Sequence, residues 1–254
     1  MQTPAFTNPD NRRPAVKFTG ILRSVGTPLG PGARVLDFGC GCGDLVRDLA
    51  AEKLDAYGCD FEVPAHEGQS VERLRAIDPQ NYRIPFDDGT FDAVISNQVF
   101  EHVQDYGAAI REIARVLNPQ GVTLHIFPSC FRLVEPHVFV PLATRLQSYW
   151  WLRMWAAVGV RNGYQSGLPG EEVARRNHRY LGNETNYLSR GTIRDEFSRW
   201  FGQVEFCDRE FVRHLSKSWL GPLDDLTLGA FSRGVSGLHS RVLYAARPCS
   251  AAVS

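Results

Sequence analysis

The hydrophobic pattern of this chain changes several times between the short apolar runs of strands and the wider spacing of helices. Residues 33–38, ARVLDF, form an apolar run that ends at a glycine-rich turn. Residues 44–54 then carry Leu45, Leu49 and Leu54 near helical spacing. We therefore predict a strand, a turn and a helix at the start of the patterned region.

The same alternation continues along most of the chain. Apolar runs predict further strands at 55–60, 90–97, 121–127, 203–212 and 240–248, and helical spacing predicts helices at 70–77, 106–118 and 191–201. Strands and helices that alternate at this period favour a parallel sheet with helices on both faces. We therefore expect an α/β fold of the Rossmann-like, doubly wound kind.

The N-terminal segment lies outside this pattern. It is rich in Pro, Asn and Arg, and one amphipathic stretch at residues 15–25 predicts a helix. We interpret residues 1–31 as an arm with a lid helix. Because 254 residues suit one α/β domain with an insertion, we interpret residues 32–254 as a single domain.

An aromatic-rich segment interrupts the alternation between residues 129 and 188. We interpret it as a helical insertion that covers the carboxyl edge of the sheet, where Tyr149, Trp151 and Trp155 are expected to bind the acceptor. An interfacial membrane helix is the alternative, because the segment combines Trp and Tyr with Arg. The prolines within it favour the lid.

Composition narrows the range of partners and locations. Lys and Arg number 28 and so do Asp and Glu, so no net positive field attracts nucleic acid or an anionic membrane. The chain lacks a secretory signal pattern and any apolar run of about 18 residues. Its six cysteines include no C-x-x-C pair. We expect a cytoplasmic protein with reduced thiols, without a nucleic-acid partner, as a monomer or homodimer.

A glycine-rich turn follows the first predicted strand. Asp37, Gly39, Gly41 and Gly43 lie where a strand passes into a helix, the position at which open α/β sheets bind ligands. A dinucleotide fingerprint would need glycine where this chain has Asp44. A carboxylate at position 37 would also repel a pyrophosphate. The turn therefore favours a ligand with a cationic amino group.

A second anchor closes the strand at 55–60. The Asp60 carboxylate can accept hydrogen bonds from both hydroxyls of an adenosine ribose. Phe61 can lie over an adenine face, or pack beneath the next helix. Cys40 and Cys42 are separated by one residue with no histidine nearby, so we interpret them as small turn residues. We expect no metal ion in this chain.

Four segments together resemble the class I S-adenosylmethionine-dependent methyltransferases, especially their small-molecule, type 11-like branch. They are VLDFGCGCGDL, CDF, RIPFDDGTFDAVISNQVFEHV and REIARVLNPQGVTLHIF, which span about residues 33–127. The resemblance implies a mostly parallel, seven-stranded sheet with the insertion after strand 5. It also implies S-adenosylmethionine as cofactor and S-adenosylhomocysteine as product.

The resemblance assigns cofactor contacts residue by residue. The positions that match the family's motifs are Asp37, Gly39, Gly41, Gly43, Asp60 and Asn97. Cys40 in the turn, Phe61 and Asn81 complete the expected cofactor-binding set. The family commonly has Asp-Ala before its Leu-Pro-Phe motif, where it meets the adenine. This chain has Gln80-Asn81 before Ile-Pro-Phe instead.

The expected catalytic residues follow the strand at 90–97. Glu101 and His102 lie close to where the methyl group should emerge, and histidine titrates in the range useful to a base. They can instead be a local structural pair. His137, in the insertion, is a second candidate base, or an ordinary lid histidine. Asp87-Asp88 is interpreted as a turn rather than a metal site.

The leading hypothesis is a methyltransferase that acts on a hydroxyl of a small acceptor, such as a sugar or secondary metabolite. N- or C-methylation, a non-catalytic cofactor-binding regulatory protein and a membrane-surface enzyme acting on lipid-linked glycans are the alternatives. The N-P-P-Y tetrapeptide used to methylate flipped adenines is absent from the end of the strand, which reads SNQVF.

Overall fold

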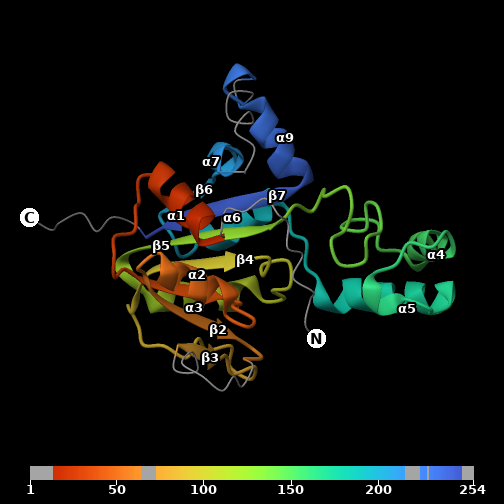
Figure 1. Cartoon of the computed structure of the whole chain (residues 1–254), viewed down its shortest axis with the longest axis horizontal. Coiled ribbons are helices and arrows are strands. Elements are labelled where there is room, and N and C mark those ends of the chain that lie inside the picture. The colour runs from red at the N-terminus through yellow and green to blue at the C-terminus, as the bar shows by residue number, and fades with distance from the viewer. Residues whose placement is uncertain (1–13, 64–72, 215–223, 228, 248–254) are drawn as a thin grey trace, which may run out of the picture.

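A seven-stranded sheet forms the centre of the computed structural model, which describes residues 14–63, 73–214, 224–227 and 229–247 (Figure 1). Its strands are β1 (Arg34–Phe38), β2 (Asp55–Asp60), β3 (Leu74–Ala76), β4 (Phe91–Asn97), β5 (Leu117–Pro128), β6 (Gln203–Phe206) and β7 (Ser240–Ala246). They are ordered β3-β2-β1-β4-β5-β7-β6. Pairing is parallel from β3 to β5, and β7 runs antiparallel to β5 and β6. The predicted fold is confirmed.

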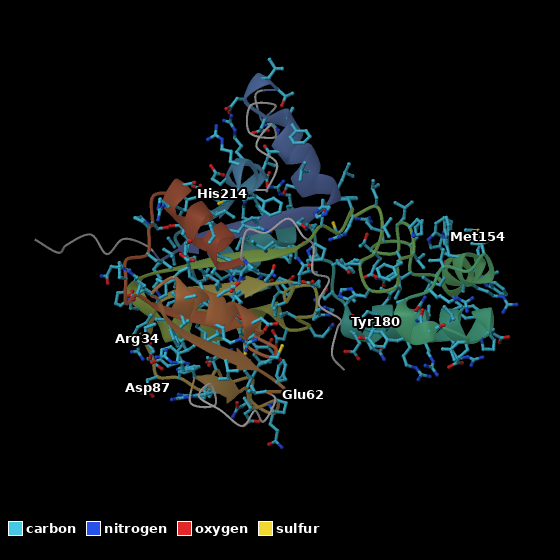
Figure 2. All side chains as sticks on the ribbon, viewed as in Figure 1. Arg34, Glu62, Asp87, Met154, Tyr180 and His214 are labelled. Carbon is cyan, nitrogen blue, oxygen red and sulfur yellow. The ribbon has the colours of Figure 1, made fainter. Side chains whose placement is uncertain are left out.

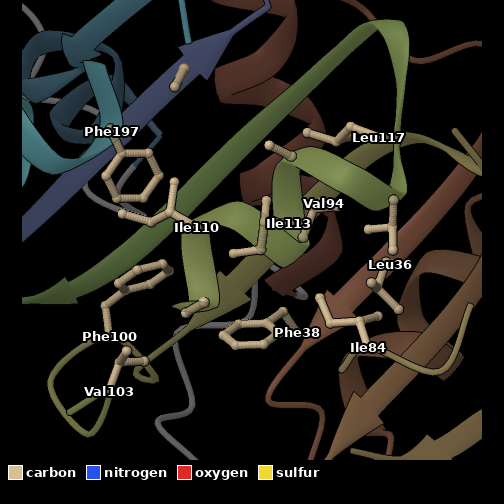
Figure 3. Packing of buried hydrophobic residues seen from close by; sticks show 14 of the residues in the cluster. Leu36, Phe38, Ile84, Val94, Phe100, Val103, Ile110, Ile113, Leu117 and Phe197 are labelled. Atoms are coloured by element: carbon tan, nitrogen blue, oxygen red, sulfur yellow. The ribbon is translucent and has the colours of Figure 1, made fainter. Parts of the chain in front are cut away.

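Helices cover both faces of this sheet: α1 (Pro14–Ser24), α2 (Asp44–Ala51), α3 (Tyr106–Val116), α6 (Arg190–Ser198), α7 (Asp208–Arg213) and α9 (Ala230–Leu238). The remaining described helices, α4 (Tyr149–Ala157), α5 (Gly170–Glu184) and the short 3-10 turn η1 (Gly163–Gln165), lie beyond one edge of the sheet (Figure 1). Successive strand residues point to opposite faces, so Val35 packs with α1 and α2 while Leu36 packs with α3. Figure 3 shows the hydrophobic cluster on the Leu36 face, in which Ile110 of α3 and Phe197 of α6 lie over the sheet.

The predicted helix near the N-terminus is confirmed as α1. A proline at the first helical position suits this start, because its missing N–H has no partner there in any case. Phe18, Ile21 and Leu22 are buried in the cluster that also contains residues of α2 and α7. The helix is thus part of the core, and its action as a lid remains a prediction. Residues 1–13 of the predicted arm lie outside the described residues.

The helix predicted at 70–77 is wrong in its described part. Residues 74–76 form β3, the edge strand beside β2. The Leu74 side chain lies over two glycines, since a Cβ at Gly58 or Gly43 would come within 2.8 Å of it. Pairing with β2 and this close packing outweigh the local helical spacing, a case of tertiary context overriding propensity.

The strand predicted at 203–212 is too long. β6 ends at Phe206, and α7 begins two residues later. Helical geometry lets Phe211 and Val212, which are adjacent in sequence, both be buried against the core, whereas strand neighbours would point to opposite faces. Arg190 also binds the Asp208 carboxylate in the first turn of this helix, at 2.8 Å.

The segment between β5 and α6 builds a small lobe of its own. An irregular stretch leads to α4, η1 and α5, and a third hydrophobic cluster joins residues such as Val140, Leu152 and Val173. In Figure 1 the lobe extends from the side of the sheet toward which β4 and β5 run. Met154 on α4 marks its far end, and Tyr180 on α5 lies nearer the sheet (Figure 2). Within the described ranges, no helix is long and apolar enough to span a membrane.

Candidate active site

The turn between β1 and α2 has the geometry of a ligand cradle. Gly39, Gly41 and Gly43 have φ values of 80°, 51° and 79°, in the left-handed region that favours glycine. Cβ atoms at Gly39 and Gly43 would collide with the side chains of Val99 and Leu74. A Cβ at Gly41 would meet none of the described atoms within 4 Å. The first and third glycines therefore permit close packing, and Gly41 faces open space where a ligand can lie.

Asp60 fastens this turn to the end of β2. Its Oδ2 accepts the N–H of Gly41 at 2.8 Å, and its Oδ1 accepts the N–H of Phe61 at 2.7 Å. Each carboxylate oxygen can accept a second hydrogen bond. The carboxylate is thus held in one orientation with acceptor capacity left for the two ribose hydroxyls.

Asp37 brings a buried carboxyl group to the same turn. It is 3% exposed, and burial together with the charge of Asp60 raises its pKa to about 8. Low dielectric and a like charge both disfavour the ionised form. A cationic ligand group beside Asp37 would stabilise the ionised carboxylate. This carboxyl group therefore fits the ammonium of S-adenosylmethionine, from which it could accept a hydrogen bond.

An aromatic pair borders the cradle. Phe61 is 45% exposed and meets Tyr82 edge-on, with ring centroids 5.3 Å apart. Within the described residues its aromatic partner is Tyr82 rather than a helix above it, and its exposed surface can stack on adenine. Asn81 is exposed, but its side chain already hydrogen-bonds to its neighbours: it donates to Asp78 and accepts from the Arg83 N–H. Its predicted adenine contact gains no support from this geometry.

Two further predicted cofactor residues occupy different environments. The Cys40 side chain is buried and packs toward Gly58, and burial raises the pKa of its thiol. Cys40 can therefore contact a cofactor mainly through its backbone. Asn97 ends β4 and is exposed beside the turn.

Asp88 pairs with Arg115 at 2.7 Å, which agrees with a structural turn at Asp87-Asp88.

The three predicted catalytic residues come together although they lie far apart in sequence. One ligand-type atom from each of Glu101, His102 and His137 lies within 4.8 Å of the others. The two imidazole rings meet edge-on with centroids 4.9 Å apart. Val99 contacts the Gly39 turn two residues before Glu101, so this polar cluster adjoins the cradle.

Burial dominates the electrostatics of this cluster. Glu101 is 1% exposed, and burial raises its pKa to about 8. Burial also lowers the pKa of His102, an effect that its hydrogen bond to the Glu184 carbonyl partly opposes. A neutral imidazole is thus favoured at His102, which leaves a lone pair on that ring.

Residues of the insertion orient the cluster. His137 Nδ1 lies 2.7 Å from Glu135 Oε1, and the Tyr187 hydroxyl donates to the same oxygen at 2.6 Å. The Tyr180 ring packs against His137 at 5.5 Å. The Tyr187 side chain also borders a surface hollow lined by Thr144, Arg145, Gln147, Thr185 and Asn186. The insertion therefore takes part in building this site.

The aromatic residues expected to bind the acceptor have another setting. Tyr149, Trp151 and Trp155 pack against the lobe's own hydrophobic cluster. The Trp151 indole N–H donates to the Pro141 carbonyl at 2.8 Å. They sit on α4, at the far end of the lobe in Figure 2, and their contact with the acceptor remains a prediction.

The fold and the cradle agree with the comparison to known families. A model described as a methyltransferase domain matches residues 11–180. The chain belongs to this family. The resemblance inferred from the four sequence segments is confirmed.

Curated methyltransferases share parts of the sequence. A demethylmenaquinone methyltransferase of Mycolicibacterium gilvum is 34% identical over 93 residues, which are 37% of this chain and 41% of that enzyme. A sarcosine/dimethylglycine N-methyltransferase of Halorhodospira halochloris is 28% identical over 234 residues, or 83% of this chain and 78% of that enzyme. The chain thus matches less than half the length of the first relative.

Solved structures share the fold. A methyltransferase from Mesorhizobium loti superposes with a TM-score of 0.51 at 17% identity, covering 89% of this chain and 95% of that one. Phosphoethanolamine N-methyltransferase 2 from Haemonchus contortus, solved with phosphomonomethylethanolamine and S-adenosylhomocysteine, has a TM-score of 0.50 at 17% identity. The match covers 90% of this chain and 51% of that one. At these identities the likeness concerns the fold alone.

Sequence reasoning missed several side chains of the site. Glu135 precedes His137 by two residues, and that spacing could have indicated the pair. Tyr82, Tyr180 and Tyr187 carried no such signal, because each reaches the site through a turn or a lobe whose path the hydrophobic pattern did not predict.

Proposed function

We propose that this protein is an S-adenosylmethionine-dependent methyltransferase that methylates a hydroxyl group of a small acceptor. One observation carries the proposal: a glycine cradle with two carboxyl groups is joined through Val99 to a cluster of one buried carboxyl group and two half-buried imidazoles. Val99 links the two halves, since it packs on Gly39 and precedes Glu101 by two residues. The cradle suits the cofactor and the cluster suits the acceptor.

The cofactor half rests on four residues. Asp37 would hold the ammonium group, Asp60 the ribose hydroxyls, Phe61 the adenine face, and Gly41 the space in which the ligand lies. When bound, S-adenosylmethionine supplies an activated methyl group on sulfur. The protein's own task is to align the acceptor with that group and exclude water.

The acceptor half supplies proton acceptors. The carbonyl of Glu184 and the carboxylate of Glu135 each accept from an imidazole Nδ1–H, so that in the neutral form of each ring the proton acceptor is Nε2. A hydroxyl must lose its proton when it gains a methyl group, and a positioned base assists this step. These residues therefore favour an oxygen acceptor.

N-methylation is the second candidate, because the relative matched over 234 residues is named for sarcosine and dimethylglycine. C-methylation and a regulatory protein without turnover are further alternatives. The product decides among them: O-, N- and C-methylated compounds differ in fragmentation, and cofactor binding without any product would indicate regulation.

Acceptor pools incubated with methyl-labelled S-adenosylmethionine would test the proposal. We expect a labelled product that carries one methyl group on oxygen, and calorimetry should detect cofactor binding in the same preparation. Labelled product on nitrogen or carbon would overturn the oxygen assignment, and absence of cofactor binding by the folded protein would overturn the whole proposal.

We also propose a cytoplasmic location and a monomeric or homodimeric state. Five cysteines of the described region, Cys40, Cys42, Cys59, Cys130 and Cys207, form no disulfide, as a reducing compartment would require. Cell fractionation and light scattering test these two statements; recovery with a membrane fraction would contradict the first.

A further inference from the structure

We propose that Glu101, His102 and His137 bind one divalent transition-metal ion of the zinc class. Each residue offers one ligand atom, and the three atoms lie within 4.8 Å of one another. Two imidazoles and one carboxylate form the three-ligand set of open zinc sites, in which a fourth position remains for water or substrate. The inference reverses our expectation from sequence that the chain holds no metal.

The orientation of both histidines supports metal binding. His102 Nδ1 lies 2.6 Å from the carbonyl oxygen of Glu184, and His137 Nδ1 lies 2.7 Å from Glu135 Oε1. A carbonyl can only accept a hydrogen bond, and the Glu135 carboxylate already accepts from Tyr187 and two backbone N–H groups. Nδ1 therefore carries the proton in both rings.

In the neutral form of each ring, Nε2 is therefore the atom that can bind a metal ion. Histidines that ligate metals usually donate their other ring N–H to a carboxylate or a backbone carbonyl, which fixes the tautomer and turns the ring toward the ion. His137 has the first kind of partner and His102 the second. The outer contacts of a metal site are thus already formed in this protein.

Glu101 provides an independent indication. Its side chain is 1% exposed, and neither carboxylate oxygen has a hydrogen-bond partner within the part of the chain that the structure describes. A buried carboxyl group without partners is costly, and such groups are normally paired or bind metals. The backbone holds it in place, since the Asn186 N–H donates to the Glu101 carbonyl at 2.6 Å.

The ligand types select the class of ion. Mg²⁺ and Ca²⁺ prefer sites built from oxygen, whereas imidazole suits Zn²⁺, Fe²⁺, Ni²⁺ and Cu²⁺. With both Nε2 atoms bound to the ion, the histidines would no longer act as bases; the cation would instead assist loss of the proton by lowering the pKa of a hydroxyl group bound at its open position. This last consequence rests on the proposed O-methylation, whereas binding of the ion does not.

Zinc titration of metal-stripped protein tests the inference. We expect one equivalent of Zn²⁺ to bind in a chelator competition assay and Co²⁺ to give the visible absorption of a low-symmetry site. Glu101→Gln, His102→Gln and His137→Gln should each weaken zinc binding by more than the roughly 10- to 100-fold that loss of an outer contact costs. His178→Gln is the matched control, because His178 is exposed on α5 and belongs to another aromatic contact.

A second variant separates metal binding from folding. Glu135→Gln keeps all three ligands but weakens the acceptor of the His137 Nδ1–H, so zinc affinity should fall about 10- to 100-fold. Zinc should raise the melting temperature of the parent and of His178→Gln much more than that of the ligand variants. Retained S-adenosylmethionine binding would show that the variants are folded.

Each result has a definite meaning. Failure of the folded parent to bind stoichiometric Zn²⁺, or equal zinc affinity in the ligand variants and the control, overturns the inference. Zinc binding that depends on the three ligands supports it even if no methyl transfer is found, and in that case only the proposed function fails.

Discussion

At the residue scale, the three glycines of the cofactor turn have different reasons to be glycine. Gly39 and Gly43 leave room for protein side chains, whereas Gly41 leaves room for a ligand. The sequence predicted all three positions, because the strand-to-helix context and their spacing are local features. It could not assign their separate reasons, since Val99 and Leu74 reach the turn from other elements.

We predict that Gly41→Ala lowers cofactor affinity at least tenfold while the chain still folds. The added Cβ occupies the open side of the turn, and φ of 51° adds about 1–2 kcal/mol of backbone strain. Calorimetry with S-adenosylmethionine measures the loss. Gly26→Ala is the control, because Gly26 also has a positive φ, 86°, and open space around it but lies outside the turn. Equal affinities in both variants would contradict the assignment.

A second prediction concerns the buried Asp37. Its pKa is about 8 in the folded chain against an ordinary value of 3.8. Between these pH values the folded chain retains a proton that the unfolded chain has released, so the free energy of unfolding falls as pH rises. Asn cannot ionise, so Asp37→Asn should be increasingly more stable than the parent from about pH 4 to pH 8.

The stability difference between Asp37→Asn and the parent should reach a few kcal/mol and then level off, since each unit of pKa difference corresponds to about 1.4 kcal/mol. Urea unfolding of cofactor-free protein across this pH range measures it. The same variant should bind S-adenosylmethionine more weakly. A difference that stays constant with pH would rule out titration of Asp37 as its source.

At the element scale, local patterns predicted the central strands and failed where distant contacts decide. β1, β2 and β4 were found because each is a short segment with several buried residues next to a turn. β3 was taken for a helix because its short sequence has helical spacing, and only pairing with β2 makes it a strand. α7 was merged into β6 for the same reason: nothing local marks the point at which the chain leaves the sheet.

The insertion has its own core, and this separation can be tested. Leu152 on α4 is fully buried within the lobe's cluster. Leu152→Ala should destabilise the lobe by about 2–5 kcal/mol. Hydrogen exchange should accelerate in α4 and α5 and stay slow in β4 and β5, with S-adenosylmethionine affinity unchanged. If exchange accelerates equally in the sheet, the lobe and sheet unfold as one unit.

At the scale of the whole molecule, the candidate site lies at the junction between the sheet and the lobe. The sheet supplies the cradle and Glu101-His102, while the lobe supplies His137, Glu135 and Tyr187. Sequence motifs predicted the site residues that the sheet supplies, because these residues follow the ends of strands in a known topology. Of the lobe residues in the catalytic cluster the sequence predicted only His137, because the path of the chain through the lobe depends on contacts between segments far apart in sequence.

Asn186 joins the two parts at this junction. Its side-chain amide donates to the carbonyls of Val103 and Gln104 at 3.0 and 3.4 Å, while its backbone N–H donates to the Glu101 carbonyl. These contacts hold the loop after β4 against the end of the lobe. Asn186→Ala would remove both side-chain bonds, one part-buried and one exposed, and a typical hydrogen bond contributes about 0.5–1.5 kcal/mol.

We therefore predict that Asn186→Ala lowers acceptor turnover severalfold or more and leaves cofactor affinity near that of the parent, because the cradle lies wholly on the sheet side. Asn118→Ala is the matched control: the Asn118 side chain also makes two hydrogen bonds, to Asp92 and Gln120, where β5 begins and away from the strand ends that carry the site. Steady-state kinetics with the identified acceptor, together with cofactor calorimetry, measures both effects. Equal turnover in the two variants would mean that the junction does not position the catalytic cluster, and a parallel loss of cofactor affinity in Asn186→Ala would mean that the cradle itself depends on the lobe.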